Sequence, residues 1–333
     1  MCEALIISVK YAFILNELMA YPLSVVCWVL NVTQSGFHAW RKRPPSKRAQ
    51  DRDSLSTDIR RVYDAHRGRY GAPRIYRVLC EHDGYTGSLN RIQTLMRALK
   101  LRAKAGRKYK ATTDSGHTLP VAANLLGQDF SCDTGPASTS HAKAPDQVWL
   151  SDITYLWTRE GWLYVCAVLD LFTRKIVGWA IAGHMTRELV LDALRMAYAK
   201  RKPGRALIFH SDRGSQYASA EVRCWLAERG LRQSMSSTGN CFDNAPMESF
   251  WHSLKVEETH GQDFATRAQA QHCVFAYIEG WYNTTRMHSS LGYQSPAQFE
   301  RACHAASIKT NNDNPINKPS KNSPSARLTK RAA

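Results

Sequence analysis

The spacing of hydrophobic positions predicts a helical N-terminal part. From Leu23 to Leu30 apolar residues recur at helical spacing, and Asn31 suits the left-handed conformation of a following turn. Thr33 can cap a helix that continues to Trp40. Together these features predict a helix-turn-helix. Three more helices are expected over residues 54–66, 73–81 and 88–99.

The pattern changes after residue 146 to short apolar, β-branched runs that alternate with helical segments. Strands are expected over residues 147–156, 162–170, 174–182, 206–211 and 232–236, and helices over 186–200, 219–229 and 266–281. Three strands joined by tight turns, followed by strands separated by helices, predict an α/β fold. The sheet should be mixed and covered by helices on both faces.

Composition changes at two further places. Residues 111–145 are rich in Thr, Ser, Gly, Ala and Asp with little periodicity, which predicts a linker that is at least partly disordered. Residues 306–333 carry scattered Lys and Arg without apolar periodicity, which predicts a disordered tail. The expected domains are therefore 1–110, a basic helical DNA-binding region, and 146–305, a catalytic core.

The net charge of +17 is concentrated in one region. Residues 41–110 contain 20 Lys and Arg against 6 Asp and Glu, whereas residues 147–300 contain 16 against 15. A basic region beside a nearly neutral one indicates phosphate binding, with a solvated face or a disordered basic arm as the alternative. The predicted DNA-binding residues are Arg41, Lys42, Arg43, Arg91, Arg97, Lys100, Arg102, Lys104, Arg107, Lys108 and Lys110.

The sequences that flank three carboxylates indicate a metal-binding site. Asp152 lies in one expected strand, Asp212 ends another, and Glu248 follows Pro246 at the start of a helix. Two strand ends and a helix can bring three carboxylates to one point, and oxygen ligands suit Mg²⁺ or Mn²⁺. A single Asp at a strand end is more often a turn or capping residue, which is our interpretation of Asp170.

Four blocks around these carboxylates resemble a known family. Trp149–Tyr155, His210–Tyr217, Ser236–Phe250 and His288–Pro296 are similar to the integrase core of OrfB transposases of bacterial insertion sequences, in the IS-three group. The resemblance is weaker over residues 10–102. It implies a ribonuclease H-like fold, a DDE triad of Asp152, Asp212 and Glu248, and a DNA contact by Lys255. Ser151 departs from the family, since Thr is more usual there.

The activity expected from this resemblance is cleavage at the ends of an insertion sequence and transfer of the 3′-hydroxyl. Two divalent ions would bridge the scissile phosphate. The expected partners are double-stranded DNA, as terminal repeats and as target, further copies of the chain, and an upstream OrfA protein or fusion. Three alternatives remain: a nuclease that does not join ends, a DNA-binding repressor or inactive remnant, and half of an enzyme completed by OrfA.

Cysteine and histidine usage and hydropathy bear on the class of protein. Nine cysteines without a CxxC pair indicate a reduced, cytoplasmic protein. The histidines lack the pattern of a zinc module, so no structural zinc is expected. The apolar stretch from Ala12 to Leu30 is interrupted by Asn16, Glu17 and Pro22, so neither a membrane span nor a membrane partner is expected.

Aromatic residues cluster early in the expected core. Trp149, Tyr155, Trp157, Trp162 and Tyr164 lie on two strands that should be adjacent. Aromatic residues that alternate on strands usually belong to the core or to cross-strand pairs. A platform for base stacking is the alternative.

Overall fold

The structure is a computed structural model that describes residues 7–104, 119–131, 141–237 and 241–312. It divides into two compact units. Unit 1 comprises residues 1–68 and 78–102, and unit 2 comprises residues 69–77 and 103–333. The short segment 69–77 therefore belongs to the same compact unit as the sheet.

Unit 1 begins with three helices, α1 (Ile7–Glu17), α2 (Leu23–Val29) and α3 (Gln34–Lys42). Asn31 has a φ of 51°, and the Thr33 side chain accepts a hydrogen bond from the backbone N–H of Gly36. Both features are as the sequence predicts. Ile14 and Phe37 are fully buried between the helices. Helix α1 is an addition to the helices expected from the sequence; its apolar positions form a nearly continuous run from Tyr11 to Leu15.

Three further helices follow, α4 (Lys47–Ala65), α5 (Ala72–His82) and α6 (Leu89–Ala98). Ser46 caps α4 and Ser88 caps α6 through hydrogen bonds from the backbone to the side-chain oxygen. Ile59 and Ile92 are fully buried, so α4 and α6 present apolar faces to the core of unit 1.

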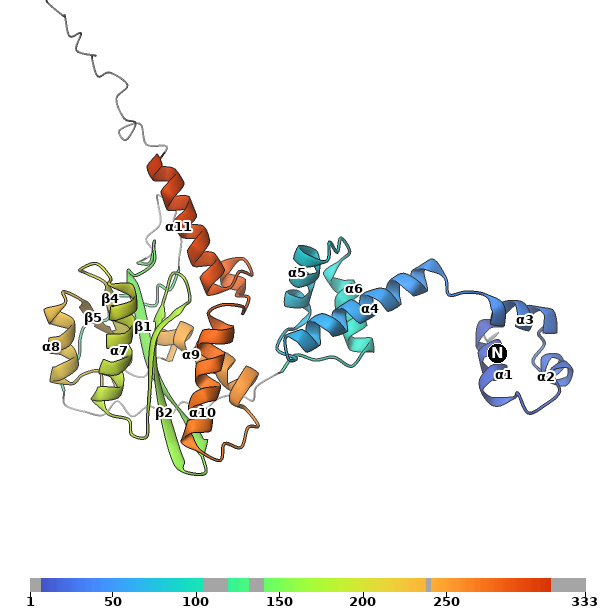
Figure 1. Cartoon of the computed structure of the whole chain (residues 1–333), viewed down its shortest axis with the longest axis horizontal. Coiled ribbons are helices and arrows are strands. Elements are labelled where there is room, and N and C mark those ends of the chain that lie inside the picture. Colours follow the sequence, from blue (N-terminus) through green and yellow to red (C-terminus); the bar gives the residue numbers. More distant parts are fainter. Residues whose placement is uncertain (1–6, 105–118, 132–140, 238–240, 313–333) are drawn as a thin grey trace, which may run out of the picture. The chain divides into compact units, whose positions relative to one another are not determined.

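Unit 2 contains a five-stranded sheet in the order β3-β2-β1-β4-β5. The strands are β1 (Val148–Thr158), β2 (Gly161–Asp170), β3 (Ile176–Ala182), β4 (Ile208–Ser211) and β5 (Arg232–Met235). The first three pair antiparallel, and β4 pairs parallel with both β1 and β5. The sheet is mixed, as the sequence predicts. The β1–β2 hairpin extends beyond the other strands (Figure 1).

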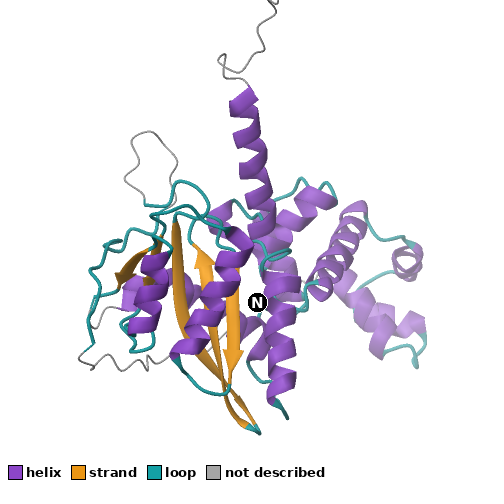
Figure 2. Ribbon diagram, turned by 60° about the vertical axis from the view of Figure 1, so that its left-hand side comes forward, coloured by secondary structure: helices purple, strands orange, loops and turns teal. Residues whose placement is uncertain are grey.

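Helices cover both faces of this sheet (Figure 2). Alternate residues of β1 and β2 contribute to two separate apolar cores, because side chains alternate in direction along a strand. One core includes α7 (Arg187–Arg201) and α8 (Ala220–Glu228), and the other includes α9 (Ala245–Leu254) and α10 (Arg267–Phe275). Gly178 allows α7 to approach β3 closely, since a Cβ there would lie 2.3 Å from the Ala193 carbonyl oxygen.

Two peripheral segments complete the described part of unit 2. Residues 119–131 fall within the range predicted to be a linker, yet Leu126 is only 2% exposed and packs in the core. The helix α11 (Pro296–Asn312) extends into the range predicted to be a disordered tail. Residues 141–145 are also described, with Ala142 fully buried, whereas residues 111–118, 132–140 and 313–333 lie outside the described residues. No described helix is long and apolar enough to cross a membrane.

Candidate active site

Two of the three carboxylates lie on neighbouring parallel strands. The register of β1 and β4 places Leu150 opposite His210. Asp152 and Asp212 each come two residues later in the sequence, one within β1 and the other directly after β4. Since parallel strands lie about 4.8 Å apart, the two carboxylates leave the sheet at the same point.

Each of these carboxylates is oriented by hydrogen bonds. Asp152 accepts one from its neighbouring backbone N–H at Ile153 and another from the Trp251 indole N–H at 3.1 Å. Asp212 accepts a hydrogen bond from the backbone N–H of Gly214, at 3.0 Å. Trp251 lies on the helix that carries Glu248, so this indole connects the helix directly to Asp152.

A network of hydrogen bonds fixes the start of that helix, α9. The buried His210 ring contacts the Asp243 carbonyl oxygen at 2.8 Å through Nε2, and Nδ1 contacts the Ser234 hydroxyl at 2.8 Å. The Asn244 side chain donates to the Ser151 carbonyl oxygen, one residue before Asp152. Glu248 therefore follows a turn that is attached to both central strands. Its side chain is exposed.

The three carboxylates interact electrostatically. Burial raises the pKa of Asp152 to about 8, and the negative charges of Asp212 and Glu248 contribute to this increase. Partial desolvation also raises the pKa of Glu248, although the residue as a whole is exposed. Within the described residues, no three His, Cys, Asp or Glu side chains are close enough to form a metal-binding cluster. The three groups are thus near enough for their charges to interact, where β4 ends beside β1, without forming such a cluster.

Lys255 lies beside this group. Helix α9 ends at Leu254 and continues as a π-helical turn over Lys255–Thr259. The Lys255 ammonium lies 5.5 Å from the centre of the Tyr155 ring. Burial lowers the pKa of Lys255 to about 8, although the nearby Asp152 charge raises it. Glu258, three residues further along the chain and thus within reach of Lys255 on a helix, pairs with Arg69 instead.

The π-helical turn is anchored by buried charges that sequence reasoning missed. Glu257 pairs with Arg286 at 2.8 Å and accepts further hydrogen bonds from Tyr277 and Trp281. The neighbouring Glu258 pairs with Arg69, whose side chain is 5% exposed. Arg69 also lies over the Trp281 ring, at 4.5 Å from its centre. A single sequence gives no local signal for pairs so far apart in the chain.

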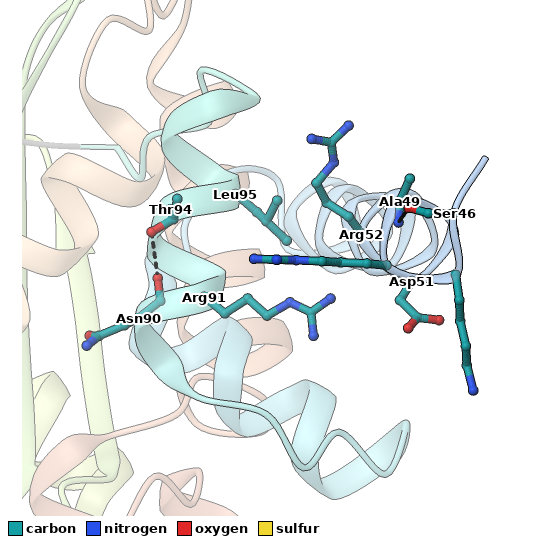
Figure 3. Close-up of a pocket in the computed structure, with 10 residues that line it drawn as sticks. Ser46, Ala49, Asp51, Arg52, Asn90, Arg91, Thr94 and Leu95 are labelled. Atoms are coloured by element: carbon teal, nitrogen blue, oxygen red, sulfur yellow. Dashed lines mark hydrogen bonds between the residues drawn. The ribbon is translucent and has the colours of Figure 1, made fainter. Parts of the chain in front are cut away.

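Unit 1 contains a cationic groove between the start of α4 and α6 (Figure 3). Arg91, a predicted DNA-binding residue, lines it together with three cations that were not singled out. These are Lys47, Arg48 and Arg52. The groove has a volume of about 1010 Å³, and Asp51 is its one acidic lining residue among those described. The regional excess of positive charge was the only sequence signal for this grouping.

The other predicted DNA-binding residues are dispersed. Arg41, Lys42 and Arg43 are exposed at the end of α3, and Arg97, Lys100 and Arg102 are exposed at and after the end of α6. Lys104 belongs to unit 2 and donates a hydrogen bond to the Glu257 carbonyl oxygen. Arg107, Lys108 and Lys110 lie outside the described residues.

Comparison with known proteins identifies the family. Models of the integrase core domain match residues 142–241 and 248–302, and a model of an HTH-like domain matches residues 50–109. Transposase InsF for insertion sequence IS3A of Escherichia coli (strain K12) is 42% identical over 293 residues, which cover 87% of this chain and 98% of the relative. The chain belongs to the IS3 transposase family. The resemblance inferred from the sequence is confirmed.

A second relative is consistent with this membership. The insertion element IS600 uncharacterized 31 kDa protein of Shigella sonnei is also 42% identical, over 84% of this chain and 98% of the relative. Among solved structures, the catalytic core domain of BIV integrase is 13% identical with a TM-score of 0.37, over 49% of this chain and 99% of that one. The sheet and the integrase-core match confirm the expected fold class, including the preceding helical region.

Family membership supports a transposase role for the chain. The integrase core spans all four residues of the candidate site, since Asp152 and Asp212 lie in its first matched range and Glu248 and Lys255 in its second. Such a core indicates a polynucleotidyl transferase. The HTH-like range includes the cationic groove residue Arg91.

Proposed function

We propose that the chain is a DDE transposase that cleaves DNA at the ends of its insertion sequence and joins the 3′-hydroxyl to a new phosphodiester. The observation that supports this proposal is the position of Asp152, Asp212 and Glu248 on or after two adjacent parallel strands and on one helix, near enough for the charges of the other two to raise the pKa of Asp152. The pKa of Asp152 is raised partly by the other two carboxylates, so a cation would relieve their repulsion.

Asp152, Asp212 and Glu248 would hold the metal. Their oxygen donors suit Mg²⁺, with Mn²⁺ as a substitute, and a pair of ions fits the chemistry of phosphodiester exchange. When bound, such ions activate the attacking oxygen and stabilise the leaving oxygen.

The chain's own side chains would orient these ligands and the substrate. The Trp251 indole holds one oxygen of Asp152 and leaves the other to the Ile153 N–H and to a ligand. Lys255 would hold a DNA phosphate beside the carboxylates, because its ammonium lies close to Asp152. The cationic groove and the exposed cations of α3 and α6 would bind the DNA backbone.

The partners follow from this activity. The substrates would be double-stranded terminal repeats and target DNA, two ends would require more than one copy of the chain, and an upstream OrfA protein or fusion would act with it in the bacterial cytoplasm.

The test is a joining assay with labelled element-end DNA that already carries a 3′-hydroxyl, in Mg²⁺ or Mn²⁺, with and without OrfA. Asp152→Asn, Asp212→Asn and Glu248→Gln should each reduce joining by at least about 100-fold and leave DNA binding nearly intact, because each removes a ligand charge without removing a phosphate contact. Asp192→Asn is the control, since Asp192 is exposed on α7 and pairs with Arg195.

The outcomes separate the alternatives. Cleavage without joining would indicate a nuclease, and binding without either reaction would indicate a repressor or an inactive remnant. Joining that appears only when OrfA is added would identify the chain as half of an enzyme. Wild-type levels of joining in any triad variant would remove that residue from the site.

A further inference from the structure

The β1–β2 hairpin carries three large aromatic side chains on its surface. Tyr155, Trp157 and Trp162 are 37%, 59% and 43% exposed, although most large apolar side chains of β1 and β2 are buried. They therefore lie outside the core and form cross-strand pairs, whereas Trp149 is fully buried; core or cross-strand pairing is the interpretation that the sequence favours.

The three rings form one continuous surface. The register places Trp157 opposite Trp162, and their ring centres are 4.8 Å apart in an edge-to-face arrangement. Tyr155 contacts Trp162 in the same way, with ring centres 5.0 Å apart. These cross-strand contacts hold each ring in place and leave aromatic faces accessible to a ligand. The neighbouring β4 pairs with β1 only as far as Leu150, so it does not extend beside these residues.

Lys255 connects this surface to the candidate active site. Tyr155 is three residues after Asp152 on the same strand, about 10 Å along it, and because side chains alternate in direction the two leave opposite faces of β1. The Lys255 ammonium lies over the Tyr155 ring and is close enough to Asp152 for their charges to interact. A strand whose phosphate is held at Lys255 would therefore meet the aromatic rings next.

We propose that Tyr155, Trp157 and Trp162 form a stacking surface for unpaired bases of the DNA strand that passes the catalytic carboxylates. This inference rests on the proposed function and adds to it a preference for DNA that is unpaired beside the reacting phosphate. Every base offers a flat aromatic face, so exposed rings next to a cation bind single strands without sequence preference. The rings would stabilise a separated end while Lys255 contacts its backbone.

The test compares two DNA ligands in chelator without divalent metal, so that catalysis does not contribute. One is a blunt duplex, and the other is the same duplex with a short single-stranded tail at the element end. Trp157→Ala and Trp162→Ala should each weaken binding of the tailed ligand by about 5- to 100-fold and leave binding of the blunt duplex unchanged. Trp157→Phe, which keeps a ring, should retain most of the affinity.

Salt dependence separates stacking from charge. Removal of a ring does not change the number of counterions that are released when DNA binds. The slope of log affinity against log salt should therefore stay the same in Trp157→Ala. Lys255→Ala should instead reduce that slope by about 0.9. The matched control is Phe275→Ala, because Phe275 is 50% exposed in unit 2 on α10 and should affect neither ligand.

A measurement on the wild-type chain does not depend on how the variants fold. The fluorescent base 2-aminopurine in the tail should be quenched on binding, because it would stack on an indole or phenol ring. Absence of quenching, or equal affinity for both ligands, would overturn the proposal. A shift of oligomeric state in Trp157→Ala with unchanged DNA binding would also overturn it and assign the surface to contacts between copies. Failure of the wild-type joining assay, by contrast, would count against the proposed function alone.

Discussion

Asp152 is held where its negative charge is costly. Burial and two neighbouring carboxylates raise its pKa to about 8, so the metal-free protein binds a proton there at neutral pH. A carboxyl group whose pKa is raised by folding stabilises the folded state at low pH, and this contribution is lost as the pH rises from about 4 to about 8.

Removal of this charge should therefore stabilise the metal-free protein. We expect Asp152→Asn to raise the melting temperature in chelator at pH 8.5, by about 2–4 °C for each kcal/mol of repulsion relieved, and to change it little at pH 4. Thermal denaturation at both pH values measures this. Asp192→Asn should show no such difference, and a lower melting temperature for Asp152→Asn at pH 8.5 would contradict the assignment.

Lys255 should make DNA binding depend on pH. Its pKa is lowered to about 8 by burial, so the ammonium carries its charge below this pH and loses it above. Affinity for element-end DNA should fall between pH 7 and pH 9 in the wild type. The arginine of Lys255→Arg stays charged throughout, so its affinity should change less over this interval. Titrations at constant ionic strength measure the difference, and parallel profiles would exclude a phosphate contact by Lys255.

At the scale of elements, the segment of residues 69–77 helps to hold the π-helical turn that follows α9. Arg69 and Glu258 form an ion pair whose side chains are 5% and 17% exposed. Loss of one partner from such a pair leaves a buried charge and costs about 3–5 kcal/mol. We expect Arg69→Met to reduce the free energy of unfolding of unit 2 by about this amount, as measured by urea denaturation.

A double variant tests the cause. Replacement of both partners, Arg69→Met with Glu258→Gln, should recover most of the lost stability, because no unpaired charge remains. Arg195→Gln breaks an exposed pair on α7 and should cost about 0–1 kcal/mol. If the double variant were as unstable as Arg69→Met, packing of Arg69 on Trp281 would be the more important contribution.

At the scale of the whole molecule, we expect DNA affinity to depend mainly on the cations of unit 1 and catalysis on the carboxylates of unit 2. Replacement of Arg48, Arg52 and Arg91 by Gln removes three cations that line the groove of unit 1. The slope of log affinity against log salt should become shallower by up to about 3, because fewer counterions are released.

The matched control removes the same charge from unit 2. Arg187, Arg195 and Lys200 already pair with Glu221, Asp192 and Glu279, so their replacement by Gln should change the slope little. Both triple variants are compared with the wild type in a full-length chain. Equal slopes in the two variants would contradict a special role for the groove.

The sequence by itself determined the local structure and the chemistry of the site. Thr33 and Ser88 cap helices because a side-chain oxygen needs only a backbone N–H three residues away. The five strands follow from short apolar runs, since burial and side-chain alternation are encoded within a few residues. Asp152, Asp212 and Glu248 were recognised from their immediate flanks and from family resemblance, and their role in metal binding stays a prediction.

The tertiary structure decided which distant residues meet. Arg69 pairs with Glu258 although 189 positions separate them, and Trp251 holds the carboxylate of Asp152 across 99 positions. Trp157 is 59% exposed because no described element packs over it, which no residue near Trp157 encodes. Periodicity and capping act over a few residues, whereas these contacts depend on the path of the whole chain, and for that reason only the folded structure could show them.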